Sequence, residues 1–417
     1  MKKSLLLLSL FFSCAYTQTL SLEQSIEKTL LNNPDIQSFI LKTELSQKNY
    51  DVTFADNLPQ INLQGEYDFS QTYTSSSNGT FYTKEKDAWY SGANLKQKIW
   101  DFQKTSSKLD SLKIDEDIAS LSLEDMKALM AYKIKSLYKL IVVQKEAIEV
   151  HKKDLDSKKA YYEQAQGLVS QGFKTKADLS RFLSAVYLSE ENLAIAQASF
   201  DKTKKSLSLY MGEKIKDDTT FESDIIKKNY SFEPDLVEEE ILSNNSQLKI
   251  NALNIDKNKL LYKSAKASHY GSIDVVASYN HFDTLNEYNT STIGVTVVVP
   301  LYSGGRIEAE TQKARINIQL AKQEQSSKIL AIKESLSNLL IDIARYDKTI
   351  ASKQAQLHWA NDTKDVLEGR YKEGLSTYIE VLDAESLILT AQLELLEAYY
   401  AKSTSIDQVD YLKGKIQ

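Results

Sequence analysis

Few residues of this 417-residue chain combine in a way that could support catalysis. A hydrolase needs a nucleophile, a base and a group that orients the base. The four histidines, His151, His269, His281 and His358, lie far apart, and no Gly-x-Ser-x-Gly motif or phosphate-binding loop is present. Cys14 is the only cysteine, which excludes an internal disulfide and a cysteine-based metal site. We therefore expect no enzyme, no cofactor and no metal site.

Two neighbouring carboxylates offer a different chemistry, the attraction of cations. Glu380 and Asp383 are three residues apart, so they share one face of the helix predicted there. Carboxylates gathered at one narrow place create a field that favours cations. The ordinary alternative is a solvated, charged helix face, and these two residues alone do not decide between the two.

A repeat organises the elements around these residues. Gly92, Gly172 and Gly212 are each followed by another glycine 202 residues later, at positions 294, 374 and 414. Upstream the offset becomes 212, because the first half carries a longer connection near residues 72–87. The Ser- and Thr-rich sequence of this connection is typical of an exposed loop. Each half thus predicts a helix, two strands and a long helical hairpin.

The longest predicted helices exceed what a globular domain usually holds. Residues 103–166 contain neither glycine nor proline, and a helix of this length would extend roughly 95 Å. Apolar residues recur every three or four positions in both arms of the hairpin, which indicates a long antiparallel coiled coil. Glycines at 167, 172, 369 and 374 would form the two hairpin tips. A periplasmic or surface coiled-coil structural protein is the alternative that these helices leave open.

Four segments alternate between apolar and polar residues, as strands with two different faces do. They cover about 60–71, 88–100, 272–282 and 291–300, and each is long enough to cross an outer membrane when tilted. A soluble amphipathic sheet would alternate in the same way. Four strands cannot close a membrane barrel, because the smallest have about eight, and open edges in lipid leave backbone groups unsatisfied. Membrane strands would therefore require several copies of the chain.

The N-terminus and the charge narrow the compartment and the partners. Residues 1–17 have the order of a secretory signal peptide: Lys2 and Lys3, an apolar stretch, then small residues. Cys14 leaves open a second processing route, lipoprotein acylation. No later segment approaches 18 consecutive apolar residues, so no transmembrane helix is expected. A net charge of −6 without a basic stripe argues against a nucleic-acid partner.

The chain resembles the TolC family of bacterial outer-membrane efflux proteins over nearly the whole mature sequence. The most specific motif is PLYSGGR at 300–306, in which Pro300 ends a strand and Gly304 and Gly305 allow the turn into a helix. Its first-half counterpart, at 99–104, lacks both glycines, so only one of the two turns carries the full motif. The second specific match runs from Arg370 to Gly374 and continues with EVLDAE at 380–385.

The resemblance implies a mixed α and β membrane protein. Three copies, a homotrimer, would close one twelve-stranded barrel in the outer membrane, and a long α-helical barrel would continue it across the periplasm. It implies a passive exit duct of a tripartite efflux or type I secretion system, with a periplasmic adaptor (membrane fusion) protein, an inner-membrane pump and outer-membrane lipid as partners. The implied order is a signal peptide at 1–17, a first repeat at 18–212 with its hairpin at 103–212, an equatorial linker at 213–231, and a second repeat at 232–417 with its hairpin at 306–414.

The resemblance also assigns roles to single residues. Glu380 and Asp383 match acids that ring the narrow end of the pore, and Asp178 and Tyr371 match contacts that hold it closed. Gly172, Phe173, Gly374 and Leu375 match the tips on which the adaptor docks. Ser376 departs from the arginine that some members carry, and the candidate substitutes for that arginine are Lys174, Lys176 and Lys372.

Overall fold

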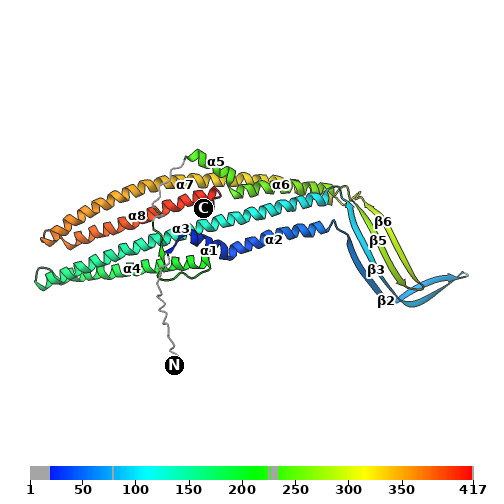
Figure 1. Ribbon diagram of the computed structural model, residues 1–417, viewed down its shortest axis with the longest axis horizontal. Helices are drawn as coiled ribbons and strands as arrows, with labels where there is room; N and C mark the ends of the chain where they lie inside the picture. The colour runs from blue at the N-terminus through cyan, green and yellow to red at the C-terminus, as the bar shows by residue number, and fades with distance from the viewer. Residues whose placement is uncertain (1–18, 78, 224–225, 227–232, 416–417) are drawn as a thin grey trace, which may run out of the picture. The chain divides into compact units, whose positions relative to one another are not determined.

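The computed structural model describes residues 19–77, 79–223, 226 and 233–415 (Figure 1). The predicted signal peptide and Cys14 lie outside these residues. The chain divides into two compact units, each assembled from segments far apart in the sequence. The sheet unit contains Ser38–Asp125 and Asn244–Ala331, and the helical unit contains Met1–Gln37, Met126–Ser243 and Ile332–Gln417.

One antiparallel sheet dominates the sheet unit. Its strands are β2 (Gln60–Ser77), β3 (Thr80–Trp100), β5 (Ser272–Asp283) and β6 (Glu287–Val298), and they lie in the order β2-β3-β5-β6 (Figure 1). The register places Ala277 between Leu95 on β3 and Ile293 on β6, so odd-numbered apolar residues share one face. Within the described chain, β2 and β6 each have a free edge.

The first hairpin of the sheet is longer than the sequence predicted. The prediction of a loop at 72–87 is wrong, because β2 and β3 run through this stretch as a paired hairpin that extends beyond β5 and β6. Threonines and aromatic residues in the stretch favour extended backbone. The pairing that begins at Gln71 and Lys86 supplies hydrogen bonds that a loop would lack. Gly79, with φ of 77°, provides the left-handed residue at the turn.

The single helix predicted at the start of each half is in fact two. α1 (Leu22–Asn32) precedes α2 (Pro34–Ala55), and α5 (Pro234–Asn244) precedes α6 (Ser246–Ala267). An asparagine separates each pair and caps the second helix. Asn33 Oδ1 accepts a hydrogen bond from the backbone N of Asp35 at 2.9 Å, and Asn245 Oδ1 accepts one from Gln247 N at 3.1 Å. Such caps start a new helix more readily than they continue an old one.

The helices of the sheet unit are joined by polar contacts. α3 (Lys104–Ser170) and α7 (Arg306–Lys372) follow the strands, and both begin in the sheet unit and end in the helical unit. Lys257 on α6 forms an ion pair with Asp115 on α3 at 2.7 Å. Ser264 Oγ donates to the carbonyl of Lys104 at 2.8 Å, which fixes the end of α6 beside the start of α3.

The helical unit contains two hairpins, α3 with α4 (Lys176–Met211) and α7 with α8 (Tyr378–Leu412) (Figure 1). Its core includes the buried Tyr138, whose Oη donates to the carbonyl of Leu20 at 2.5 Å and accepts from Glu222 N at 2.9 Å. These bonds tie α3 to the short parallel pair β1 (Thr19–Leu20) and β4 (Thr220–Phe221). Burial raises the pKa of Tyr138 to about 12. None of the helices that the structure describes is long and apolar enough to span a membrane.

Candidate functional site at the helical tips and on the sheet

Both hairpin tips turn through a left-handed glycine. Gly172 and Gly374 have φ angles of 82° and 74°. Phe173 N donates to the carbonyl of Leu168 at 2.9 Å, and Leu375 N makes the equivalent bond in α7 at 2.8 Å. This is the Schellman ending of a helix, which glycine favours. The side chains of Phe173 and Leu375 project from the tips and are 73% and 68% exposed.

The two returning helices begin with the same capping box. Thr175 N donates to the Asp178 carboxylate at 3.1 Å, and Asp178 N donates to Thr175 Oγ1 at 3.2 Å. Thr377 N donates to Glu380 Oε2 at 2.7 Å in the same arrangement. The backbone N–H of Thr175 holds the pKa of Asp178 below its usual value. Asp178 and Glu380 therefore occupy equivalent positions and stabilise the first turns of α4 and α8.

The predicted cation-selecting pair lies on the surface of α8. Glu380 and Asp383 are both exposed. Because Glu380 bonds back to Thr377, its carboxylate is held at a helix N-terminus, where the helix dipole favours negative charge. This cap was not predicted from the sequence, although a threonine three residues before a glutamate is its usual signature. One chain supplies two carboxylates, so a ring of them requires several chains.

Behind the tips, the two hairpins meet in a buried aromatic cluster. Phe182 on α4 is fully buried, and its ring centroid lies 6.4 Å from that of Tyr371 on α7 and 5.5 Å from that of Tyr378 on α8. Tyr161 on α3 stacks against Phe182 at 6.2 Å. Val381 packs into the same cluster. Residues from all four helices thus pack at one point, with the ring geometries that aromatic pairs prefer.

Tyr371 lies close to two residues that the sequence analysis singled out. Burial, and then the charge of Asp178, raise the pKa of the Tyr371 hydroxyl. Lys174 Nζ lies 5.1 Å from the centre of the Tyr371 ring, so one of the three candidate substitutes for the arginine contacts this tyrosine. Ser376 is buried, and its Oγ donates to the carbonyl of Leu367 at 3.0 Å. Lys174 and Tyr371 therefore interact as a cation over an aromatic ring.

Glu385 is a buried carboxylate to which the sequence analysis gave no role. Its residue is 6% exposed. Ser157 Oγ on α3 donates to Glu385 Oε1 at 2.5 Å, and Lys364 Nζ on α7 lies 3.3 Å from the same oxygen. The second oxygen, Oε2, has no hydrogen-bond partner in the described chain. In the sequence, the spacing of Glu385 from Tyr378 and Val381 indicates that this carboxylate lies on the buried face of α8.

Both strand-to-helix turns use two consecutive left-handed residues. Gly304 and Gly305 have φ angles of 64° and 81°, as the motif predicts. Phe102 and Gln103, at the equivalent places of the first half, have φ angles of 55° and 71°. The first turn thus has the same conformation although it lacks the glycines. For an L-residue this conformation costs about 1–2 kcal/mol, so the first turn is strained and the second is not.

Side chains at the start of each turn cap the helix that follows. Asp101 Oδ2 accepts a hydrogen bond from Thr105 N at 3.0 Å. Ser303 Oγ accepts one from Ile307 N at 3.4 Å in the second turn. Pro300, which cannot donate to a neighbouring strand, lies just beyond the end of β6. The two caps hold the entry to α3 and to α7 in place.

The sheet has one apolar and one polar face. Odd positions carry exposed apolar side chains, among which Leu63 and Ile293 are 86% and 83% exposed. The polar face carries the even positions, where Asn94, Ser278 and Thr292 pair across three neighbouring strands. This division confirms that odd residues share a face, and the apolar face is uncovered in a single chain.

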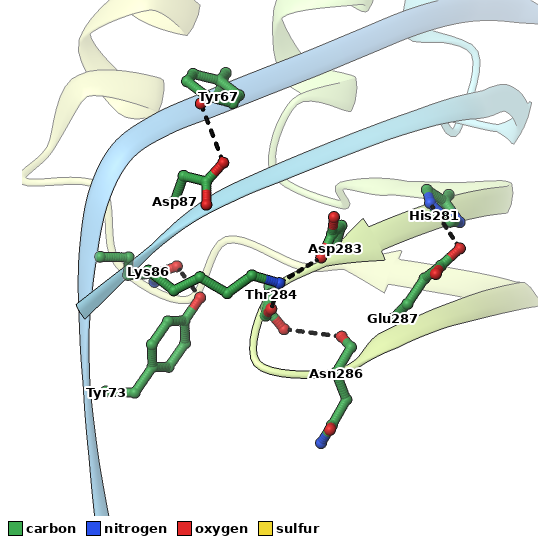
Figure 2. Close-up of polar contacts among 10 residues, drawn as sticks. Tyr67, Tyr73, Lys86, Asp87, His281, Asp283, Thr284, Asn286 and Glu287 are labelled. Atoms are coloured by element: carbon green, nitrogen blue, oxygen red, sulfur yellow. Dashed lines mark hydrogen bonds and ion pairs between the residues drawn. The ribbon is translucent and has the colours of Figure 1, made fainter. Parts of the chain in front are cut away.

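Charged side chains link the strands at the turn end of the sheet, which is the part beside the β5–β6 turn at 284–286. Figure 2 shows Lys86 reaching from β3 to β5, where its Nζ lies 2.8 Å from Asp283 Oδ1 and donates to the carbonyl of Thr284 at 2.6 Å. This clamp fixes the long β2–β3 hairpin at the place where it extends beyond its neighbours. Figure 2 also shows the pairs Tyr67 with Asp87, His281 with Glu287, and Thr284 with Asn286.

Sequence comparison finds relatives along almost the whole chain. The outer membrane efflux protein family model matches residues 25–213 and 237–414. The outer membrane protein TolC of Escherichia coli strain K12 is 22% identical over 423 residues, covering 94% of this chain and 82% of TolC. The proteases secretion protein PrtF of Dickeya chrysanthemi is 22% identical over 419 residues, covering 96% and 89%.

Structural comparison finds the same fold in solved channel proteins. A structure of CusC superposes with a TM-score of 0.81 at 17% identity, covering 94% of this chain and 91% of CusC. The outer membrane protein VceC of Vibrio cholerae gives a TM-score of 0.79 at 16% identity, covering 95% and 97%. With the family match extending over most of its length, this chain belongs to the outer membrane efflux protein family, the family of TolC, and is a transport protein of the cell outer membrane that extends into the periplasm.

Proposed function

We propose that three copies of this chain form a passive exit duct of a tripartite efflux or type I secretion system. The observation that carries this proposal is a four-stranded sheet with two free edges and an uncovered apolar face. Four strands are too few for a barrel, whereas three copies supply twelve. The barrel would place the apolar face toward lipid and the polar face toward a lumen.

One assembly would resolve both problems of the isolated sheet. Pairing β2 of one copy with β6 of the next satisfies the backbone groups that lipid cannot. Lipid would also cover the exposed apolar side chains, such as Leu63, Ile293 and Val297. Removal of each large apolar side chain from water is worth about 1.5–3 kcal/mol. The polar face would remain in contact with water inside the barrel.

The helical hairpins would continue the duct through the periplasm. Phe173 and Leu375, exposed at the tips that Gly172 and Gly374 shape, are the proposed contacts for a periplasmic adaptor protein. An inner-membrane pump would supply energy and choose the cargo. This fits the names of the relatives, since PrtF is a proteases secretion protein and OpmQ of Pseudomonas aeruginosa is a pyoverdine export outer membrane protein.

The narrow end of the duct would be closed by packing between the hairpins. The aromatic cluster around Phe182 and Tyr371, with Lys174 over the Tyr371 ring, supports this role. Asp178 would take part in this closure through the effect of its negative charge on the Tyr371 hydroxyl. Three copies would bring six carboxylates of Glu380 and Asp383 around one axis, where they would favour cations.

Charge removal that preserves the helix cap tests the acidic ring. Glu380→Gln with Asp383→Asn removes both charges, while glutamine keeps the capping box with Thr377. Lower cation selectivity and weaker block by trivalent cations added at the tip side are expected, with unchanged assembly. Glu397→Gln, at an exposed position on the same helix, is the matched control. Unchanged selectivity in the double variant would contradict the ring and make Asp178 the next candidate.

Conductance tests the duct itself. Purified protein added to a planar lipid bilayer should give stepwise increases in current, because a twelve-stranded barrel encloses a water-filled lumen. Protein that has been heat-dissociated to single chains should give no steps. Membranes that stay silent with the intact assembly would contradict the proposal.

The N-terminal processing belongs to the same proposal. Cleavage after Ala15 or Thr17 would release the first residues, whereas acylation would leave a lipid on Cys14 as the first residue. The intact mass of the mature protein separates these routes.

The equal lengths of α3 and α7, 67 residues each, support the internal repeat on which the two halves are assigned.

A further inference from the structure

One row of the polar sheet face is aromatic. Tyr90 on β3 pairs with Phe282 on β5, and Phe282 pairs with Tyr288 on β6. These three residues are called the aromatic row. The next row toward the helices consists of Gly92, Asn280 and Thr290, so the aromatic row stands out on a face that is mostly polar. It lies at the turn end of the sheet.

The three rings form a continuous stack, and the last ring of the stack is exposed. The centroids of Tyr90 and Phe282 are 5.4 Å apart with 28° between the planes, and those of Phe282 and Tyr288 are 5.1 Å apart with 17°. Cross-strand aromatic pairs stabilise sheets, which explains these two contacts. Tyr288, however, lies on the edge strand and is 48% exposed. In a single chain, one face of the stack is therefore available for a further flat ring.

Carboxylates border the row on the same face. Glu66 pairs with Tyr90, and Asp68 pairs with Ala88 one row further out, and both acids are exposed. Glu66 extends the row on the β2 side. In the proposed assembly, β6 of one copy lies beside β2 of the next, so Tyr288 would adjoin the strand that carries Glu66 of that copy.

The lysines of β3 do not neutralise these carboxylates. Lys86 is engaged by Asp283 and the carbonyl of Thr284. Lys84, Lys96 and Lys98 are six or more residues from Tyr90, which is at least about 20 Å along a strand. The surroundings of the aromatic row are therefore negative, and negative charge beside stacked rings suits an aromatic cation.

We propose that the aromatic row, with the carboxylates of β2, binds flat aromatic cations at the outer end of the lumen. The inference rests on the proposed function, in which the polar face lines the duct. The flat ring of the ligand stacks on Tyr288, and the carboxylates of β2 balance its charge. The row is thus a last contact for cargo of this chemical class before release.

Ethidium, a flat aromatic cation, is the probe. Added to the turn-end side of the channel in a planar bilayer, it should reduce the current through the wild type. Tyr288→Ala should raise the half-blocking concentration about tenfold, as expected for the loss of one ring contact to a cation. Tyr288→Phe, which keeps the ring, should block like the wild type. Tetraethylammonium, a cation without a flat ring, should block weakly and show no dependence on Tyr288.

The matched control lies on the opposite face of β5. Tyr279→Ala removes an exposed ring on the apolar face and should leave the half-blocking concentration unchanged. If Tyr288→Ala fails to assemble, Tyr288→Leu replaces it, since leucine keeps apolar bulk without a ring. The inference is overturned if Tyr288→Ala, or Tyr288→Leu in its place, is blocked at the same concentration as the wild type, or if Tyr279→Ala raises the half-blocking concentration as much as they do.

A silent wild-type membrane would contradict the proposed function and not the aromatic row. Ethidium fluorescence with the detergent-solubilised protein then tests the row alone. Enhanced fluorescence that Tyr288→Ala reduces supports the site, and fluorescence that is equal in both proteins overturns it.

Discussion

Glycine exchange at the two strand-to-helix turns should have opposite effects on stability. Gln103 and Gly305 are equivalent residues with φ angles of 71° and 81°. Gln103→Gly removes an exposed side chain and relieves a strained backbone, whereas Gly305→Ala introduces the same strain. The first change should stabilise the protein and the second should destabilise it.

The magnitudes follow from the surroundings of the two residues. A left-handed L-residue costs about 1–2 kcal/mol, and the greater freedom of glycine in the unfolded chain offsets about 0.5–1 kcal/mol of this. Gln103→Gly should therefore stabilise by about 0.5–1 kcal/mol. A Cβ at Gly305 meets no atom within 4 Å, so Gly305→Ala should cost a similar amount through the backbone alone.

Urea unfolding in detergent, with strand signal followed by circular dichroism, measures both variants. Gly271→Ala serves as a reference for a steric effect, since its Cβ would lie 1.8 Å from the carbonyl oxygen of Val298. That variant should lose far more stability than Gly305→Ala. If Gln103→Gly and Gly305→Ala change the free energy of unfolding in the same direction, the backbone conformation is not the source of the difference.

Three further predictions concern the two faces of the sheet, the aromatic cluster and a helix cap. Val297→Lys should cost about 2–4 kcal/mol of stability and reduce the yield of assembled protein, because it puts a cation on the apolar face. Thr296→Lys, on the polar face, should assemble normally, and equal yields of the two variants would contradict the assignment of the faces. Phe182→Ala should lower the free energy of unfolding by about 3–5 kcal/mol, speed hydrogen exchange at the start of α8 and enlarge the conductance. Leu188→Ala, at an exposed position, should change little. Slow exchange in both variants would count against closure by this cluster. The pKa of Asp178 is lower in the folded protein than its ordinary value of 3.8, so its cap is fully present above pH 3.8 and is lost as the pH falls through the folded-state pKa. Hydrogen exchange at the start of α4 should therefore become faster on acidification in the wild type and change less in Asp178→Asn.

Local patterns predicted much of the fold because they act over short distances. The alternation that puts Ile293 and Val297 on one face is a property of a single strand, and the glycines at 172 and 374 indicate helix ends by themselves. The stretch at 72–87 was misread because its serines and threonines are common in loops, while the pairing that makes it a hairpin depends on a partner strand. Composition within one segment cannot supply that partner.

The site residues were harder to predict because most of them depend on register or on packing between elements. The aromatic row exists only through the pairing of three strands, so Tyr90, Phe282 and Tyr288 carry no joint signal in the sequence. The left-handed pair at 102–103 was hidden because its residues are not glycine. Glu385 could have been found, because it continues the buried face of α8.

Native mass spectrometry of the detergent-extracted protein tests the central claim most directly. We expect a mass of three mature chains, because twelve strands are required where one chain provides four. Brief heating should convert this species to single chains that no longer conduct. A stable, conducting single chain would contradict the account.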